Sequence, residues 1–335
     1  MRMHRPMALP AASVFAVACL VAQPAAAQDK YPSHPIKVIS STGAGSGPDV
    51  VARLLFEHMS RELGQQLVME NNPTGGGLVA AQLVASAPAD GYTLMSPSAS
   101  VFTVLPVRQD RAPKLGEHLK AVGYYGDMTL AVCVSPALGV NTLKELVELV
   151  RNDPKKILYS GNANGLLPHM SGVLLNTLIG GGLTFVPYRS SADGLKDLLG
   201  GQINMIIEGI ASLDGAIKAG SIKPLAMTMP TRAPNMPDIP TVGELFPGYA
   251  AQGWAGLVAP AGTPDAIVNQ LNAVLTKVQK IPEVTARLAE LGTYIRPMNP
   301  TEFTAYIESE QKQWWPIVRE MSTPQPASPQ PAGAK

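Results

Sequence analysis

The chain contains 335 residues, and its 26 Lys and Arg against 25 Asp and Glu give a formal net charge of +1. A nucleic-acid partner is not expected, because proteins of that class usually carry a basic face and no Lys/Arg cluster occurs here. Once the N-terminal segment described next is removed, roughly 300 residues remain, a size at which a chain can divide into two lobes.

The first 27 residues have the pattern of a secretory signal peptide. Arg2 and Arg5 make a basic start, residues 8–21 are largely apolar, and residues 25–27 are alanines typical of a cleavage site. We expect an exported mature chain that begins at Gln28. The alternative is a lipid-modified Cys19, although Ala16 is a poor match for the bulky residue usual three positions before such a cysteine. No later stretch has the about 20 apolar residues that a membrane-spanning helix requires.

Residues 40–49 form a glycine-rich turn between a predicted strand (36–39) and a predicted helix (50–63). Such a turn gathers free backbone N–H groups and the positive end of a helix dipole, and this combination attracts anions. The candidate ligand-binding residues of the turn are Thr42, Gly43, Gly45, Ser46, Gly47 and Asp49. The alternatives are a turn without a ligand and, for Asp49, pairing with Arg53. Nucleotide-binding fingerprints are absent, because Pro48 stands where a glycine would be needed.

The next segments alternate between strands and helices. Strands are expected at 67–70 and 92–95, with a second glycine-rich turn and a helix (78–87) between them. This order predicts a parallel sheet with crossover helices. Ser98 and Ser100 follow the strand at 92–95, at the sheet edge where α/β proteins bind ligands. A solvated loop is the alternative for these serines.

The second half of the chain repeats the first construction. Strands at 119–125 and 130–134, with a break between them, are expected to lead into a second lobe. A strand at 157–159 is followed by Ser160, Gly161 and Asn162 and then by a helix at 168–178. We therefore expect two anion-attracting helix ends, one on each wall of a cleft. His169 at the start of the helix either contacts the ligand or packs against the protein.

The remaining predicted elements complete a second α/β lobe and a helical return to the first. They are strands at 183–186, 203–207 and 224–229, an extended segment at 251–258, and helices at 192–199, 213–218, 263–280, 282–291 and 301–321. Glu208 ends the strand at 203–207 and is either a solvated terminus or part of the cleft mouth. The proline-rich residues 322–335 are expected to be a disordered tail.

Catalytic and metal-binding signatures are missing from the sequence. The histidines after residue 27 are scattered without metal-ligand spacing, and no G-x-S-x-G elbow surrounds Ser46. We expect no catalytic residue, no metal site and no cofactor.

Short segments along the chain resemble those of a known family. They are residues 31–36, 49–54, 70–73, 89–94, 186–189, 198–202, 237–242 and 256–264. In this set the chain resembles the Bug/TctC family of periplasmic solute-binding receptors, which serve tripartite tricarboxylate transporters. The matches run in order through nearly all of the mature chain, so the set is specific.

The resemblance implies a two-lobed α/β periplasmic binding protein (type II-like), each lobe a mainly parallel sheet with helices on both faces. Lobe 1 would comprise residues 28–128 and 251–321, lobe 2 residues 129–250, and two crossing strands would join them. It also implies a monomer that binds a small carboxylate between the lobes and delivers it to membrane permease subunits. Implied contacts are residues 42–49, 98–100 and 160–162, with Ser191 and Glu208.

Two departures from the family pattern concern the ligand. Thr42, Gly43 and Ala44 replace the usual aromatic residue and two prolines, and Glu208 replaces the usual aspartate. The sequence leaves the particular carboxylate open. The alternative functions are an exported α/β hydrolase and a ligand-loaded partner of a membrane sensor.

Overall fold

The structure is a computed structural model that describes residues 31–152, 157–162 and 165–322. The predicted signal peptide, Cys19 and the predicted tail from residue 323 onward lie outside these residues. Within the described ranges, no helix is both long and apolar enough to cross a membrane.

The strands of the described chain are β1 (Ile36–Ser40), β2 (Leu67–Asn71), β3 (Thr93–Ser96), β4 (Leu119–Val134), β5 (Ile157–Ser160), β6 (Leu183–Phe185), β7 (Met205–Gly209), β8 (Lys223–Met227), β9 (Gln252–Pro260) and β10 (Thr293–Tyr294). The α-helices are α1 (Gly47–Leu63), α2 (Leu78–Ala85), α3 (Ser100–Thr103), α4 (Leu105–Arg108), α5 (Leu143–Asn152), α6 (Leu167–Ile179), α7 (Ser191–Leu199), α8 (Ile210–Lys218), α9 (Val242–Leu245), α10 (Asp265–Gln279), α11 (Pro282–Glu290) and α12 (Pro300–Ser322). Two 3₁₀ helices, η1 (Thr74–Gly77) and η2 (Pro136–Leu138), complete the described elements.

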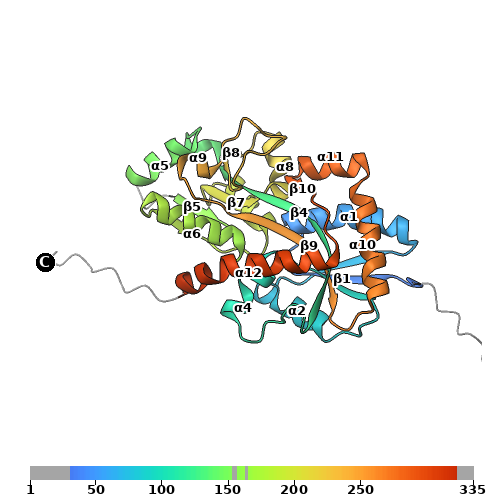
Figure 1. The fold of residues 1–335 in the computed structure, drawn as a ribbon. Helices are drawn as coiled ribbons and strands as arrows, with labels where there is room; N and C mark the ends of the chain where they lie inside the picture. Colours follow the sequence, from blue (N-terminus) through green and yellow to red (C-terminus); the bar gives the residue numbers. More distant parts are fainter. Residues whose placement is uncertain (1–30, 153–156, 163–164, 323–335) are drawn as a thin grey trace, which may run out of the picture. The chain divides into compact units, whose positions relative to one another are not determined.

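These strands form a 10-stranded sheet in the order β2-β1-β3-β9-β4-β7-β5-β6, with β8 and β10 paired to β4 (Figure 1). The β1 strand is parallel to both β2 and β3, and β5 is parallel to both β6 and β7, as the strand–helix alternation predicts. The β4 and β9 strands are antiparallel to each other and lie between these two parallel groups. The segments that follow the carboxyl ends of β1, β3, β5 and β7 contribute to the candidate functional site.

The β4 strand is continuous, whereas the sequence analysis predicts two strands with a break. Its register with β9 shifts near Gly123 and again near Gly126, so the chain bulges there and stays paired. A side chain at Gly126 would bring Cβ to 2.8 Å from the carbonyl oxygen of Tyr294. Gly123 and Gly126 therefore mark bulges in a long strand.

Helix boundaries follow local chemistry, with two corrections. Helix α1 has Pro48 in its first turn and ends at Gly64, whose φ of 69° is left-handed. Pro264 is the N-cap of α10, so this helix begins at Asp265 instead of at residue 263 as predicted. Helix α8 begins at Ile210, directly after β7, instead of at residue 213. This earlier start brings the first turn of α8 to the cleft.

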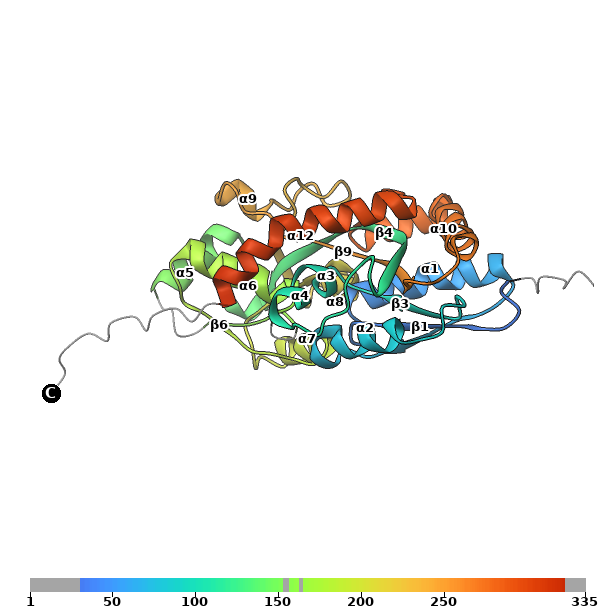
Figure 2. The same ribbon diagram turned by 60° about the horizontal axis from the view of Figure 1, so that its bottom comes forward.

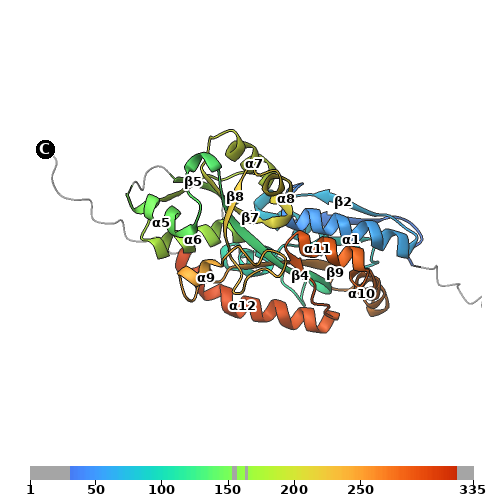
Figure 3. The ribbon, with the colours of Figure 1, turned by 90° about the horizontal axis from the view of Figure 1, so that it is seen from above.

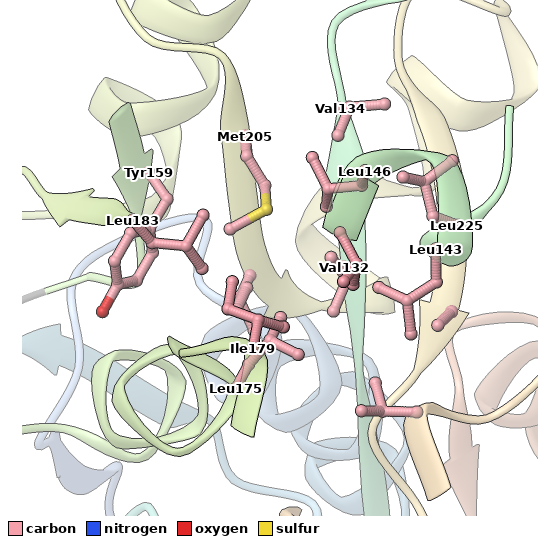
Figure 4. Close-up of a cluster of buried hydrophobic side chains, with 14 of the residues drawn as sticks. Val132, Val134, Leu143, Leu146, Tyr159, Leu175, Ile179, Leu183, Met205 and Leu225 are labelled. Atoms are coloured by element: carbon pink, nitrogen blue, oxygen red, sulfur yellow. The ribbon is translucent and has the colours of Figure 1, made fainter. Parts of the chain in front are cut away.

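Separate hydrophobic clusters occupy the two parts of the sheet. One pair of clusters is built from residues 36–128 and 254–307, and another pair is built mainly from residues 130–251 (Figure 4 shows part of the latter). We propose that these parts are the two lobes expected from the sequence, lobe 1 and lobe 2, with β4 and β9 passing between them. The separate cores support this division, because each lobe buries its own apolar surface.

Helix α12 lies across β4 and extends toward α6 (Figures 1 and 2). Trp314 joins the lobe 2 core, and Trp315 donates a 3.2 Å hydrogen bond to the carbonyl of Phe102 in lobe 1. The C-terminal helix thus contacts both lobes, whereas the sequence analysis assigns it to lobe 1 alone.

Candidate functional site

A cavity lies where the carboxyl ends of β1, β3, β5 and β7 meet between the lobes. It has about 550 Å³ of empty space, part of it open to solvent. We call it the inner cavity. Among its polar lining residues are Thr42, Ser98, Ser100, Asn162 and Glu208, which the sequence analysis selected.

The N-terminus of α1 forms one wall of the inner cavity through Gly47 and Pro48. Ser46 is the N-cap residue, and among the described residues its side chain does not cap the helix; its hydroxyl donates to Thr42 Oγ1 at 2.8 Å instead. First-turn N–H groups of a helix have no intrahelical partner. The α1 tip therefore keeps donor capacity and positive potential toward the cavity.

The N-terminus of α6 forms the opposite wall through Leu167 and Pro168. The N–H of Leu167 donates to Oγ of Ser100 at 3.0 Å, and Ser100 belongs to lobe 1. This hydrogen bond joins the lobes across the cleft. The two helix ends predicted from the sequence therefore face the same cavity, and the lobes are in contact in this structure.

The N-terminus of α8 is a third helix end at the inner cavity, and the sequence analysis missed it. Gly209, Ile210 and Ala211 line the cavity. A Cβ placed on Gly47 would lie 3.4 Å from the Cα of Gly209 and 3.9 Å from the Cβ of Ala211, so the α1 and α8 tips meet (Figure 3). No glycine-rich turn precedes α8, because the chain passes from β7 directly into the helix, so the sequence offered no anion-site signal.

Glu208 is the charged side chain of the inner cavity, and it is 2% exposed. Its Oε2 accepts hydrogen bonds from Asn162 Nδ2 (2.8 Å) and Ser191 Oγ (2.7 Å), and its Oε1 accepts one from the N–H of Gly209 (2.8 Å). Burial raises the pKa of Glu208, and these three hydrogen bonds lower the pKa in part.

The electrostatic balance of the inner cavity favours a single negative charge. None of the described lining residues is Lys, Arg or His. Each helix N-terminus carries roughly half a positive charge, so the three ends together contribute about +1.5. An ionised Glu208 reduces this to about +0.5. With Glu208 protonated, the cavity can therefore compensate one carboxylate without a cationic side chain, and with Glu208 ionised it compensates about half of that charge.

Four residues predicted in the first loop do not line the inner cavity. Asp49 is 1% exposed and accepts hydrogen bonds from the N–H of Gly45 (2.8 Å), Asn71 Nδ2 (2.7 Å) and Arg53 Nε (3.1 Å). This confirms the pairing with Arg53. Gly43 and Gly45 instead face residues 189–192 of lobe 2, and Ser46 supports Thr42. These residues shape the loop behind the cavity wall.

The predicted lobe 2 residues divide in the same way. Asn162, with φ of 64°, lines the cavity, and Ser191 lies behind it, 3.1 Å from Asn162 Nδ2. Ser160 and Gly161 do not line the cavity; a Cβ on Gly161 would lie 2.7 Å from the backbone N of His169, so this glycine allows the close approach of the turn to α6.

His169 packs against the protein, the second of its two predicted roles. Its Nδ1 accepts the N–H of Gly165 at 3.0 Å, and its ring centroid lies 4.0 Å from that of Phe185. Burial, together with the positive charge of Arg108, lowers the pKa of His169 to about 4, so the ring is neutral at neutral pH. It is absent from the described lining of the inner cavity.

Thr293 is a cavity residue for which the sequence gave no signal. It belongs to the two-residue strand β10, lines the inner cavity and is 1% exposed. Its Oγ1 has no hydrogen-bond partner among the described residues. Buried hydroxyls are normally paired, so this group points to a ligand or an ordered water as the missing partner. Met128 and Trp254 add apolar surface to the same cavity.

A metal-assisted site finds no support in the described part of the chain, where no cluster of three His, Cys, Asp or Glu side chains could hold a metal ion.

Comparison with known proteins identifies what this arrangement resembles. Residues 51–323 match the family model described as tripartite tricarboxylate transporter family receptor. The structure is similar to that of the periplasmic binding protein BugD, with a TM-score of 0.81, 28% identity, and coverage of 87% of this chain and 98% of that chain. It is similar to a Rhodopseudomonas palustris protein with adipate (TM-score 0.81, 28% identity, 87% and 97% coverage). It is also similar to MatC of Rhodopseudomonas palustris with bound malate (TM-score 0.79, 28% identity, 86% and 100% coverage).

Proposed function

Because the chain belongs to the tripartite tricarboxylate transporter receptor family, whose members are non-enzymatic solute receptors with a periplasmic binding-protein fold, we propose that it captures a small carboxylate in the inner cavity. The observation that carries this proposal is the meeting of three helix N-termini at one cavity. The adipate and malate bound to similar structures support the ligand class. An exported hydrolase is not supported, since the family is one of receptors.

The proposed cycle has three steps. A signal peptide in residues 1–27 directs export to the periplasm. The carboxylate then binds between the open lobes, and the lobes close because only the closed form offers the α1, α6 and α8 ends at once. The closed receptor finally delivers its ligand to the membrane permease subunits that such receptors serve. The lobe contact through Ser100 and Leu167 supports the closed form as the binding-competent one.

The test uses Ala211, which lines the cavity in the first turn of α8. Ala211→Asp would place a fixed carboxylate at the meeting point of the α1 and α8 tips, and Ala211→Asn is its matched control of equal size. Calorimetry against a panel of di-, tri-, amino and aromatic acids should show that wild type binds at least one of them. For that acid, the dissociation constant of the Asp variant should be at least about tenfold higher than that of the Asn variant, because the added carboxylate repels the ligand.

Misfolding is separable from this result, since an acidic residue in the first turn stabilises a helix by about 0.3–1 kcal/mol. The unfolding temperature of the Asp variant should therefore be no lower than that of the Asn variant. Equal loss of affinity in both variants, or a wild-type protein that binds no acid in the panel, would overturn the proposed function.

A further inference from the structure

A second cavity opens on the outer side of the cleft. It has about 1460 Å³ of empty space, part of it open to solvent, and we call it the outer cavity. Lobe 1 contributes residues 73–76, 100, 104, 105, 108 and 109, and lobe 2 contributes residues 165–166 and 187–189. Ser100 and Leu166 line both cavities, so the two cavities adjoin at these residues.

Two arginines face the outer cavity, one from each lobe: Arg108 at the end of α4 and Arg189 after β6. Among the described residues, neither guanidinium has a carboxylate within ion-pair distance. Arg53 and Arg296, by contrast, each contact an aspartate. No Asp or Glu occurs among the described residues that line the outer cavity. Two uncompensated positive charges thus remain at the cleft mouth.

The geometry holds both arginines close to the cleft. A Cβ placed on Gly165 would lie 2.0 Å from Nη1 of Arg108, so the Arg108 side chain reaches across to lobe 2. The N–H of Tyr188 donates to the carbonyl of Asn162 at 3.1 Å, which ties the segment before Arg189 to the inner cavity. His169 next to Arg108 is neutral and adds no further positive charge.

The two cavities differ in the charge they can compensate. The helix ends of the inner cavity, set against Glu208, compensate at most about one carboxylate. A second carboxylate on the same ligand needs a cation elsewhere, and guanidinium groups bind carboxylates through paired N–H donors.

We propose that the outer cavity is a second anion-binding subsite, in which Arg108 and Arg189 hold the distal carboxylate of an extended organic diacid. The proximal carboxylate of that ligand lies among the helix N-termini of the inner cavity. This inference rests on the proposed function and adds a ligand class to it: long diacids are preferred over monoacids of the same length. Shorter diacids gain less, because their second carboxylate does not reach the arginines.

The test compares adipate with hexanoate, which has the same chain length and one carboxylate fewer, and succinate with butyrate as a shorter pair. Affinities are measured by calorimetry for wild type, Arg108→Gln, Arg189→Gln and the double variant. Arg111→Gln is the matched control, because Arg111 is exposed and lines neither cavity. Exposed ion pairs are worth little each, so each single variant should weaken adipate binding by about twofold to fivefold.

Wild type should bind adipate more tightly than hexanoate, and the ratio of these affinities should be larger than the ratio for succinate and butyrate. The adipate-to-hexanoate ratio should fall with added salt. The double variant should bind adipate no better than hexanoate, with hexanoate affinity and the unfolding temperature unchanged. A preference that survives in the double variant, or equal wild-type affinities for adipate and hexanoate, would overturn the second subsite and leave the inner cavity intact. Failure of every acid to bind wild type would instead overturn the proposed function together with this inference.

Discussion

The hydrogen bond between Ser100 and Leu167 allows lobe closure to be tested separately from ligand contact. Ser100→Ala removes the Oγ that accepts the Leu167 N–H at 3.0 Å. In the closed form this N–H then lacks an acceptor, whereas in an open form water can replace the hydroxyl. A lost hydrogen bond of this kind costs about 1–1.5 kcal/mol, and the cost falls on the closed form alone.

If ligands bind tightly only to closed receptor, this cost appears in the measured affinity. Since 1.4 kcal/mol is a factor of ten, the dissociation constant should rise by roughly five- to twelvefold. The rise should be the same for every acid that binds, because the lost bond joins protein to protein. A direct ligand contact would instead produce a different factor for each acid.

Calorimetry with at least three acids measures these factors, and small-angle X-ray scattering measures closure on ligand addition. Thr103→Val is the matched control, because the Thr103 hydroxyl is buried in the same helix but donates to the carbonyl of Ala99 at 2.9 Å within lobe 1. Unchanged affinity in Ser100→Ala, or a loss confined to one acid, would refute the proposed coupling between this bond and closure.

Three further predictions address other parts of the site. Asp49→Asn should lower the free energy of unfolding by about 2–3 kcal/mol in denaturant titrations, because three donors lose a buried carboxylate; a loss below about 0.5 kcal/mol would contradict its anchoring role. Thr293→Val should leave the unfolding temperature unchanged or raised and weaken ligand binding by about threefold to tenfold; unaltered affinity would show that no ligand uses the hydroxyl. The pKa of Glu208 is raised above its ordinary value of 4.5 in the folded protein, so the folded state holds this proton more tightly than the unfolded state. The free energy of unfolding of wild type, relative to that of Glu208→Gln, should therefore fall as pH rises above 4.5. A difference between the two proteins that does not change with pH would contradict the raised pKa.

The sequence was sufficient for the strand–turn–helix units that build the cavity walls. Apolar periodicity predicted β1 with α1 and β5 with α6, and the glycines between them indicated helix ends that attract anions. Both units meet at the inner cavity, because the carboxyl ends of parallel strands share one sheet edge. Local patterns were informative here, since each depends on residues close together in the chain.

Side-chain orientation was not predictable in the same way. Asp49, in the first turn of α1, and Asn162, in the turn after β5, both belong to strand–turn–helix units, yet Asp49 turns toward Arg53 while Asn162 lines the cavity. The third helix end, at α8, and the unpaired hydroxyl of Thr293 depend on contacts between distant segments. Composition and spacing carry no signal for such contacts, so only the folded chain reveals them.

The central claim is that helix N-termini from both lobes bind the ligand carboxylate. A crystal structure of the receptor with the tightest-binding acid of the panel tests this most directly. The account predicts a carboxylate in the inner cavity with its oxygens about 3 Å from the backbone nitrogens of Gly47 and Ala211. A ligand bound outside the inner cavity, or a carboxylate that leaves both of these amides without contact, would contradict it.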